Sequence, residues 1–154
     1  MKRVMLVTIL VLMAQFAFSD AQAEDPTLPI TPGLYTVTSK TSSNLNPEPK
    51  IQIMDVCIDA PVLDPSGYLP SAANCSLDNV KKDGNKASFD ISCQSTKRSG
   101  GTPGMPEMKG KGDCSTTQTE LYCHFKMVLP LQEEEFTIDS VRQGRRVGDC
   151  PDLE

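Results

Sequence analysis

Six cysteines constrain this 154-residue chain more than any other feature, because all of them lie in its last two-thirds and none precedes Cys57. An even number of cysteines in a small chain is typical of a disulfide framework in an oxidising compartment. Zinc ligation would require cysteines or histidines at short spacing, whereas the closest pair here, Cys114 and Cys123, is separated by eight residues and the chain has one histidine. We therefore expect three disulfides, no metal and no cofactor.

The N-terminus has the pattern of a cleavable export signal. Two basic residues precede an uncharged, mostly apolar run over residues 4–18, which is shorter than the roughly 20 residues of a membrane-spanning helix. Ala21 and Ala23 then form the small-x-small pattern that signal peptidases recognise. We expect residues 1–23 to be removed and residues 24–154 to form one periplasmic or secreted domain with no membrane anchor after cleavage.

Charge and aromatic content exclude some partners of the mature chain. Cleavage after Ala23 would leave 13 basic and 19 acidic side chains, which disfavours nucleic acid and anionic membrane surfaces. The local basic cluster of Arg142, Arg145 and Arg146 is too small to reverse this balance. The sequence has no tryptophan and three tyrosines, so it offers few platforms for stacking bases or sugars.

The first pair of cysteines falls on a predicted β-hairpin. Asp-Gly between alternating apolar and polar runs is a strong hairpin signal, and Asp83-Gly84-Asn85 occupies the centre of such a segment. A three-residue loop at 83–85 fixes the register of the two strands. That register pairs Cys75 with Cys93, Leu77 with Ile91, and Asn79 with Phe89.

A second hairpin follows around residues 117–120. Its register places Cys114 opposite Cys123, and Gly112 opposite Phe125, whose ring would cover the bare strand position. By elimination, the remaining cysteines, Cys57 and Cys150, are left to each other. That bridge would close a loop of about 94 residues and tie the C-terminal tail to a strand near the N-terminus.

Three further strands complete an all-β prediction. They cover residues 33–41, 51–58 and 135–141, with Phe136 and Ile138 facing inward and a tail that begins at Gln143. Apolar residues alternate along the strand at 51–58, but between Ile53 and Met54 the alternation shifts by one residue. Such a shift indicates a bulge or burial on both faces. No segment has sustained helical periodicity. We expect an antiparallel meander of about seven short strands that curls into a small barrel or half-barrel, stapled by the disulfides.

Enzymatic chemistry finds little support in the sequence, and we expect no catalytic residues. His124 is the only candidate general base, and it is out of phase with the apolar face of its strand. No Gly-x-Ser-x-Gly motif occurs, and the acidic residues cluster in turns. A hydrolase of unrecognised type is the weaker alternative.

One methionine motif suggests a metal alternative. Met105 and Met108 form a Met-x-x-Met motif, whose thioethers suit Cu(I) in an exported protein. The register of the second hairpin, however, places Met108 near Leu129 and on the same face as Met127, which favours packing in the core. Copper handling through this loop is therefore kept as the alternative to a binding function.

Residues 32–41 and 144–151, together with the Val56-Cys57-Ile58 step and the Cys75–Cys93 hairpin, resemble the bacterial exported "domain of unknown function 3617" family. The resemblance covers nearly the whole mature chain and implies export and β content but no chemistry. Tyr35 stands where the family usually has tryptophan, and the Cys114/Cys123 pair is an addition to the usual set.

Arg145 and Arg146 belong to the run that carries this resemblance. Together with Tyr35 they are candidates for docking a ligand or for fastening the C-terminal tail, and an acidic chain favours the second role. The prediction as a whole is a non-enzymatic module for an unknown small apolar ligand or a protein partner.

Overall fold

The computed structural model describes residues 25–69, 74–94, 107–130 and 134–151. Regular structure in these ranges is almost entirely β-strand, which confirms the all-β prediction. The elements in chain order are β1 (Leu28–Pro29), β2 (Gly33–Ser43), β3 (Lys50–Ile58), β4 (Val62–Leu63), the 3-10 helix η1 (Pro65–Tyr68), β5 (Asn74–Asp83), β6 (Lys86–Gln94), β7 (Met108–Thr116), β8 (Glu120–Pro130) and β9 (Glu135–Gly148).

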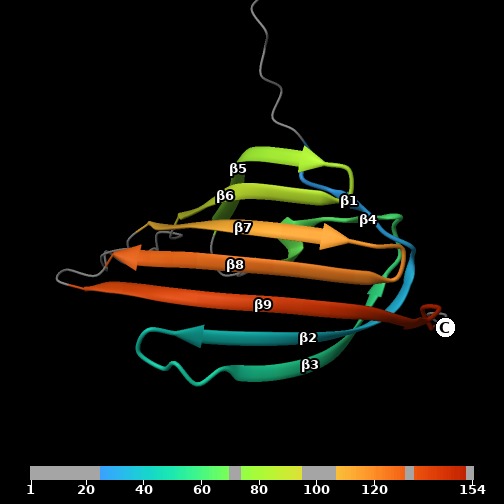
Figure 1. Ribbon diagram of the computed structural model, residues 1–154, viewed down its shortest axis with the longest axis horizontal. Helices are drawn as coiled ribbons and strands as arrows, with labels where there is room; N and C mark the ends of the chain where they lie inside the picture. Colours follow the sequence, from blue (N-terminus) through green and yellow to red (C-terminus); the bar gives the residue numbers. More distant parts are fainter. Residues whose placement is uncertain (1–24, 70–73, 95–106, 131–133, 152–154) are drawn as a thin grey trace, which may run out of the picture.

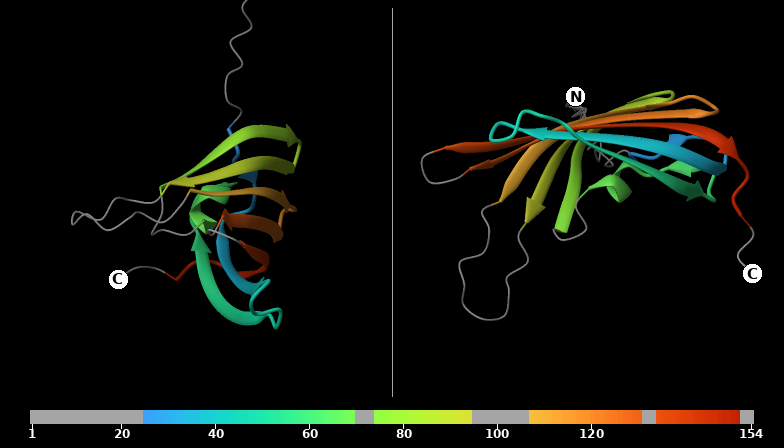
Figure 2. Two further views of the ribbon diagram at one scale, coloured as in Figure 1. Left: turned by 90° about the vertical axis from the view of Figure 1, so that its left-hand side faces the viewer. Right: turned by 90° about the horizontal axis from the view of Figure 1, so that it is seen from below.

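Seven strands of the described residues form one antiparallel sheet in the order β3-β2-β9-β8-β7-β6-β5 (Figure 1). Strands β5 to β9 pair in sequence order, as expected of a meander, and β9 then pairs with β2. A closed barrel would need a further ladder between the edge strands β3 and β5, and the described residues contain none. Of the two predicted forms, a small barrel or a half-barrel, the closed barrel is therefore wrong, and the sheet is open and strongly curved (Figure 2).

The segment between β3 and β5 explains why the sheet does not close. It carries β4, which pairs with β1, and then η1, whose start is fixed by Asp64 accepting the Ser66 backbone N–H at 2.8 Å. Pro65 opens the helix, where its missing N–H is no loss, and it is buried. Figure 2 shows η1 on the concave side of the sheet, between β3 and β5. This segment lies where a closing ladder would have to form.

The β5–β6 hairpin has two of the three predicted pairs and a different turn. Cys75 lies opposite Cys93, and Leu77 opposite Ile91, as expected. The turn has two central residues, Gly84 with φ +57° and Asn85, rather than three. A bulge at Asn79, with φ +50°, absorbs the extra residue, so the predicted pairing of Asn79 with Phe89 is wrong. The shorter turn and the bulge shift the strand register by one residue in opposite directions. The pairing of Cys75 with Cys93 is therefore unchanged.

The β7–β8 hairpin has the predicted register. Cys114 lies opposite Cys123, and Gly112 lies between Phe125 on β8 and Phe89 on β6. The centres of the two rings are 6.2 Å apart, at a tilt of 41°. A Cβ at position 112 would collide with the Phe89 ring and lie 3.1 Å from Phe125 Cδ1. The absence of a side chain there is what lets the two rings cover the strand together.

Gly112→Ala is therefore expected to lower the free energy of unfolding by about 1–3 kcal/mol, because the added methyl group overpacks a buried site. Urea denaturation of the oxidised protein measures the change. Gly67→Ala is the matched control, since a Cβ at Gly67 meets nothing within 4 Å. Equal stabilities for the two variants would show that the rings move aside without cost.

Two strands differ in detail from the prediction. The ladder between β2 and β3 is continuous from Gly33–Ile58 to Thr41–Lys50, so the bulge expected at Ile53 and Met54 is absent, as is burial on both faces. Both side chains are exposed because β3 is an edge strand. Strand β9 continues to Gly148, well beyond the predicted end at Val141, because the chain from Gln143 pairs with both β2 and β8.

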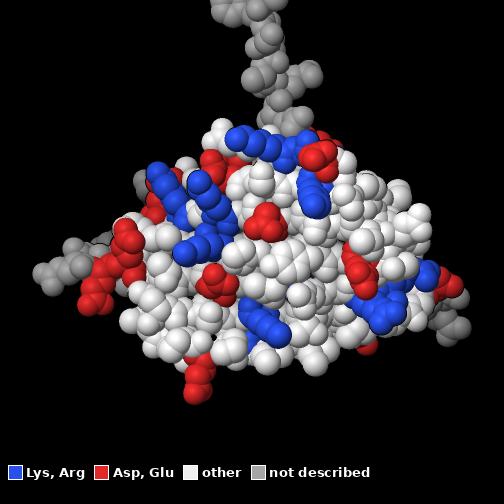
Figure 3. All heavy atoms as spheres, in the orientation of Figure 1, with Lys and Arg blue, Asp and Glu red and all other residues white. Residues whose placement is uncertain are grey.

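The core lies on the concave face of the sheet, under the layer formed by β1 and β4. Side chains there are nearly inaccessible to solvent; they include Leu28, Tyr35, Val37, Leu63, Phe89, Ile91, Phe125 and Met127. Figure 3 shows the opposite, convex face, over which acidic and basic side chains are interspersed. The sheet thus has an apolar concave face and a charged convex face. The position of each candidate site residue along its strand decides on which of the two faces its side chain lies.

Candidate functional site

All six cysteines are bridged, in the pairs that the sequence predicts: Cys57–Cys150, Cys75–Cys93 and Cys114–Cys123. Two of the bridges join neighbouring strands within a hairpin. The third joins the end of β3 to the segment after β9, with 5.4 Å between the two Cα atoms. Three bridges fit an oxidising environment outside the cytoplasm.

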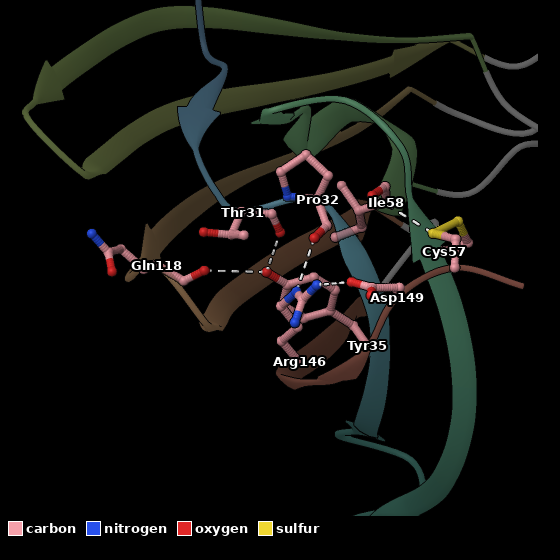
Figure 4. A network of polar contacts seen from close by, with 9 residues as sticks. Thr31, Pro32, Tyr35, Cys57, Ile58, Gln118, Arg146 and Asp149 are labelled. Atoms are coloured by element: carbon pink, nitrogen blue, oxygen red, sulfur yellow. Dashed lines mark hydrogen bonds and ion pairs between the residues drawn. A yellow bond between two sulfur atoms is a disulfide. The ribbon is translucent and has the colours of Figure 1, made fainter.

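Near the Cys57–Cys150 bridge, two of the predicted site residues lie side by side (Figure 4). Arg146 and Tyr35 are paired in the β2–β9 ladder. Arg146 donates from Nε to the Pro32 carbonyl oxygen at 2.9 Å and forms an ion pair with Asp149. Tyr35 is fully buried and donates its hydroxyl hydrogen to the Thr31 carbonyl oxygen at 2.6 Å. Both residues therefore hold the start of β2 and the chain after β9 together.

Backbone geometry at Gly33 permits this close approach. Its φ is +150°, and a Cβ there would collide with Arg146 Nε and the Gly148 carbonyl oxygen. Burial raises the pKa of Tyr35, while the Arg146 cation acts in the lowering direction. A neutral tyrosine beside a paired arginine matches the tail-fastening interpretation. Arg145 is not part of this cluster, because it lies on the convex face, beside a hollow of about 390 Å³.

The concave face carries one cation that the sequence prediction did not include as a site residue. Arg142 lies on β9, directly opposite Ser39 on β2 and Cys123 on β8. Its guanidinium carbon is 5.0 Å from the centre of the Tyr68 ring in η1. Its Nε atom is buried without a hydrogen-bond partner. In the described residues, no carboxylate pairs with this side chain.

Burial has the expected electrostatic effect on this pair. It lowers the pKa of Arg142, and the Tyr68 hydroxyl acts in the opposite direction. Burial likewise raises the pKa of Tyr68, and the Arg142 cation opposes that rise. Both shifts have the direction expected of side chains that are partly removed from water.

Polar side chains accompany Arg142 along the middle of the concave face. Ser39 and Ser140 are both buried, and the Ser140 hydroxyl lies 3.1 Å from the hydroxyl of Thr41. The sequence held a signal for this arrangement, since positions 140, 142, 144 and 146 continue one face of β9. Ending the predicted strand at Val141 hid it.

His124 lies on the convex face, as its phase predicts. Its Nδ1 is 3.6 Å from an Asp113 oxygen, and its Nε2 is 3.2 Å from both oxygens of Asp139. The ring lines a hollow of about 660 Å³ that also contains Lys111 and Lys126. A catalytic histidine needs one ring nitrogen directed at a nucleophile, whereas here both face carboxylates. The cluster is therefore a poor match for a triad.

The methionine motif is only partly within the described residues. Met108 begins β7, pairs with Cys93 and packs partly buried against the core, whereas Met105 lies outside the described ranges. No group of three or more His, Cys, Asp or Glu side chains suited to a metal ion occurs in the described residues. The predicted cleavage after Ala23 also lies outside these ranges. None of the helices in the described ranges is long and apolar enough to span a bilayer.

Together, these features define a class of small, disulfide-stapled domains built on one open antiparallel β-sheet. A family model described as "Protein of unknown function (DUF3617)" matches residues 30–150, so the chain belongs to that family, as the sequence resemblance suggested. Comparisons with curated proteins and with solved structures found no match.

Proposed function

We propose that the protein is a non-enzymatic binding module, exported to the periplasm or secreted, that holds an apolar ligand on the concave face of its open sheet. Residues 1–23 and the three disulfides support export. The carboxylates on both sides of His124 support a function without catalysis.

The observation that carries this proposal is the set of apolar side chains on the concave face that the layer of β1, β4 and η1 leaves accessible. Four apolar side chains of the concave face remain at least partly accessible to solvent: Met54, Val56, Phe136 and Ile138. Apolar surface that a folded domain leaves accessible on a concave face is typical of ligand sites. The disulfides hold this face in shape, which reduces the entropy lost on binding.

Adjacent residues on β3 provide a test with a matched control. Met54 pairs with the buried Val37 and so faces the concave side, whereas Ile53 pairs with Thr38 and faces the convex side. Titration with the uncharged fluorophore N-phenyl-1-naphthylamine should show saturable binding. Met54→Asn is expected to weaken that binding about 5- to 30-fold, because it removes apolar contact area, and Ile53→Asn to leave it unchanged. Absence of binding, or equal effects of the two variants, would contradict the proposal.

A further inference from the structure

The guanidinium of Arg142 is a charge without a counter-ion in a part of the concave face formed by apolar and hydroxyl-bearing side chains. Taking a cation out of water without a paired anion is costly, and proteins seldom keep such a group unless something compensates it. The Tyr68 ring, 5.0 Å away, supplies part of that compensation through a cation–π contact. Arg142 Nε still has no hydrogen-bond partner. The guanidinium thus keeps an unused donor, Nε, which is buried beneath the concave face in the unliganded domain.

The neighbours of Arg142 restrict what can use that donor. Buried Ser39 lies directly across the ladder, and buried Ser140 is the next residue of β9 on the same face. Along that face the following residue is the partly buried Ile138, and Met127 pairs with it on β8. A ligand on this face would therefore meet one cation and two hydroxyl-bearing residues at one point, and apolar side chains beyond it.

We propose that the ligand is a long-chain carboxylate, bound with its head group on Arg142 and its hydrocarbon chain along Ile138 and Phe136. This inference rests on the proposed function and specifies the ligand of the same site. A guanidinium donates two parallel hydrogen bonds to a planar carboxylate. Arg142 supplies one positive charge, which favours a carboxylate with one negative charge over a phosphate that carries nearly two.

A ligand series tests the inference on the oxidised wild-type protein without any substitution. Dodecanoate, dodecanol and dodecyl phosphate share one chain length and differ in head group. Isothermal titration below their micellar concentrations should give the tightest binding for dodecanoate, about 10- to 100-fold tighter than for dodecanol. Dodecyl phosphate binding at least as tightly as dodecanoate would overturn the choice of a carboxylate.

Substitutions of Arg142 then test whether this residue binds the head group of the ligand. Arg142→Met keeps a long apolar side chain and should reduce the affinity for dodecanoate about 10- to 100-fold while leaving that for dodecanol nearly unchanged. Arg142→Lys should have an intermediate effect, because it keeps the charge but loses the fork. Arg145→Met, which removes a cation from the convex face of the same strand, is the matched control and should have no effect.

The outcomes separate this inference from the proposed function. If dodecanoate and dodecanol bind alike and Arg142→Met changes neither, the anionic ligand is wrong while the apolar site stands. If none of the three ligands binds, the proposed function fails as well. Far-UV circular dichroism and a thermal melt of each variant establish that it is folded, and the wild-type series decides the question if Arg142→Met does not fold.

Discussion

Replacing Cys57 and Cys150 together by serine is expected to lower the free energy of unfolding by up to about 4.7 kcal/mol. The bridge spans a sequence separation of 93 residues, so it removes more conformational freedom from the unfolded chain than either hairpin bridge, which span 18 and 9. Cys57 is exposed and Cys150 is only partly buried, so serine adds little cavity cost to the change. Urea denaturation of the wild type and of the double variant measures it.

Reduction supplies the internal control for this experiment. In excess dithiothreitol the wild type also lacks the bridge, so the difference between wild type and variant should disappear. Amide hydrogen exchange in the oxidised variant should rise most along β3 and the start of β2, which the bridge ties to the chain after β9. A difference below about 1 kcal/mol in the oxidised state, or one that persists on reduction, would show that the bridge adds little to stability.

Phe125→Ala is expected to destabilise the domain by about 3–5 kcal/mol, the typical result of removing a buried aromatic side chain. Phe125 is 2% exposed, lies over Gly112 and contacts the ring of Phe89 at the centre of the concave core. The same denaturation assay applies, with all three disulfides intact. Ile53→Ala is the control: this side chain is large and apolar but 70% exposed, so its truncation should change stability by no more than about 0.5 kcal/mol. Similar values for the two variants would mean that Phe125 is not in the core.

Local patterns made much of this fold predictable. Alternation and turn chemistry are properties of neighbouring residues, and they fixed the β7–β8 register down to the pairing of Gly112 with Phe125. They also fixed the pairing of Cys75 with Cys93, although the bulge at Asn79 and the shorter turn at Gly84 each shift the ladder by one residue. The Cys57–Cys150 bridge followed from these two pairings alone.

The remaining features depend on contacts between distant segments. The β2–β9 ladder joins residues more than 90 positions apart, and nothing in the composition of residues 142–148 marks them as a strand. Their glycines and arginines become strand residues only because β2 and β8 bind them from both sides. For the same reason the sequence did not reveal Arg142 as a site residue. Its place on the concave face becomes clear only when β9 is known to continue beyond Val141. Closure of the sheet was equally non-local, because it depends on where β4 and η1 pack.

Nuclear magnetic resonance mapping gives the most direct test of the concave-face proposal. Amide chemical shifts of the oxidised, ¹⁵N-labelled protein are followed while dodecanoate is added. If the face binds the ligand, the shift changes will centre on Met54, Ser140 and Arg142 and leave the convex residues Asp113 and Arg145 unmoved. Changes centred on Asp113 and His124, or no changes at all, would contradict it.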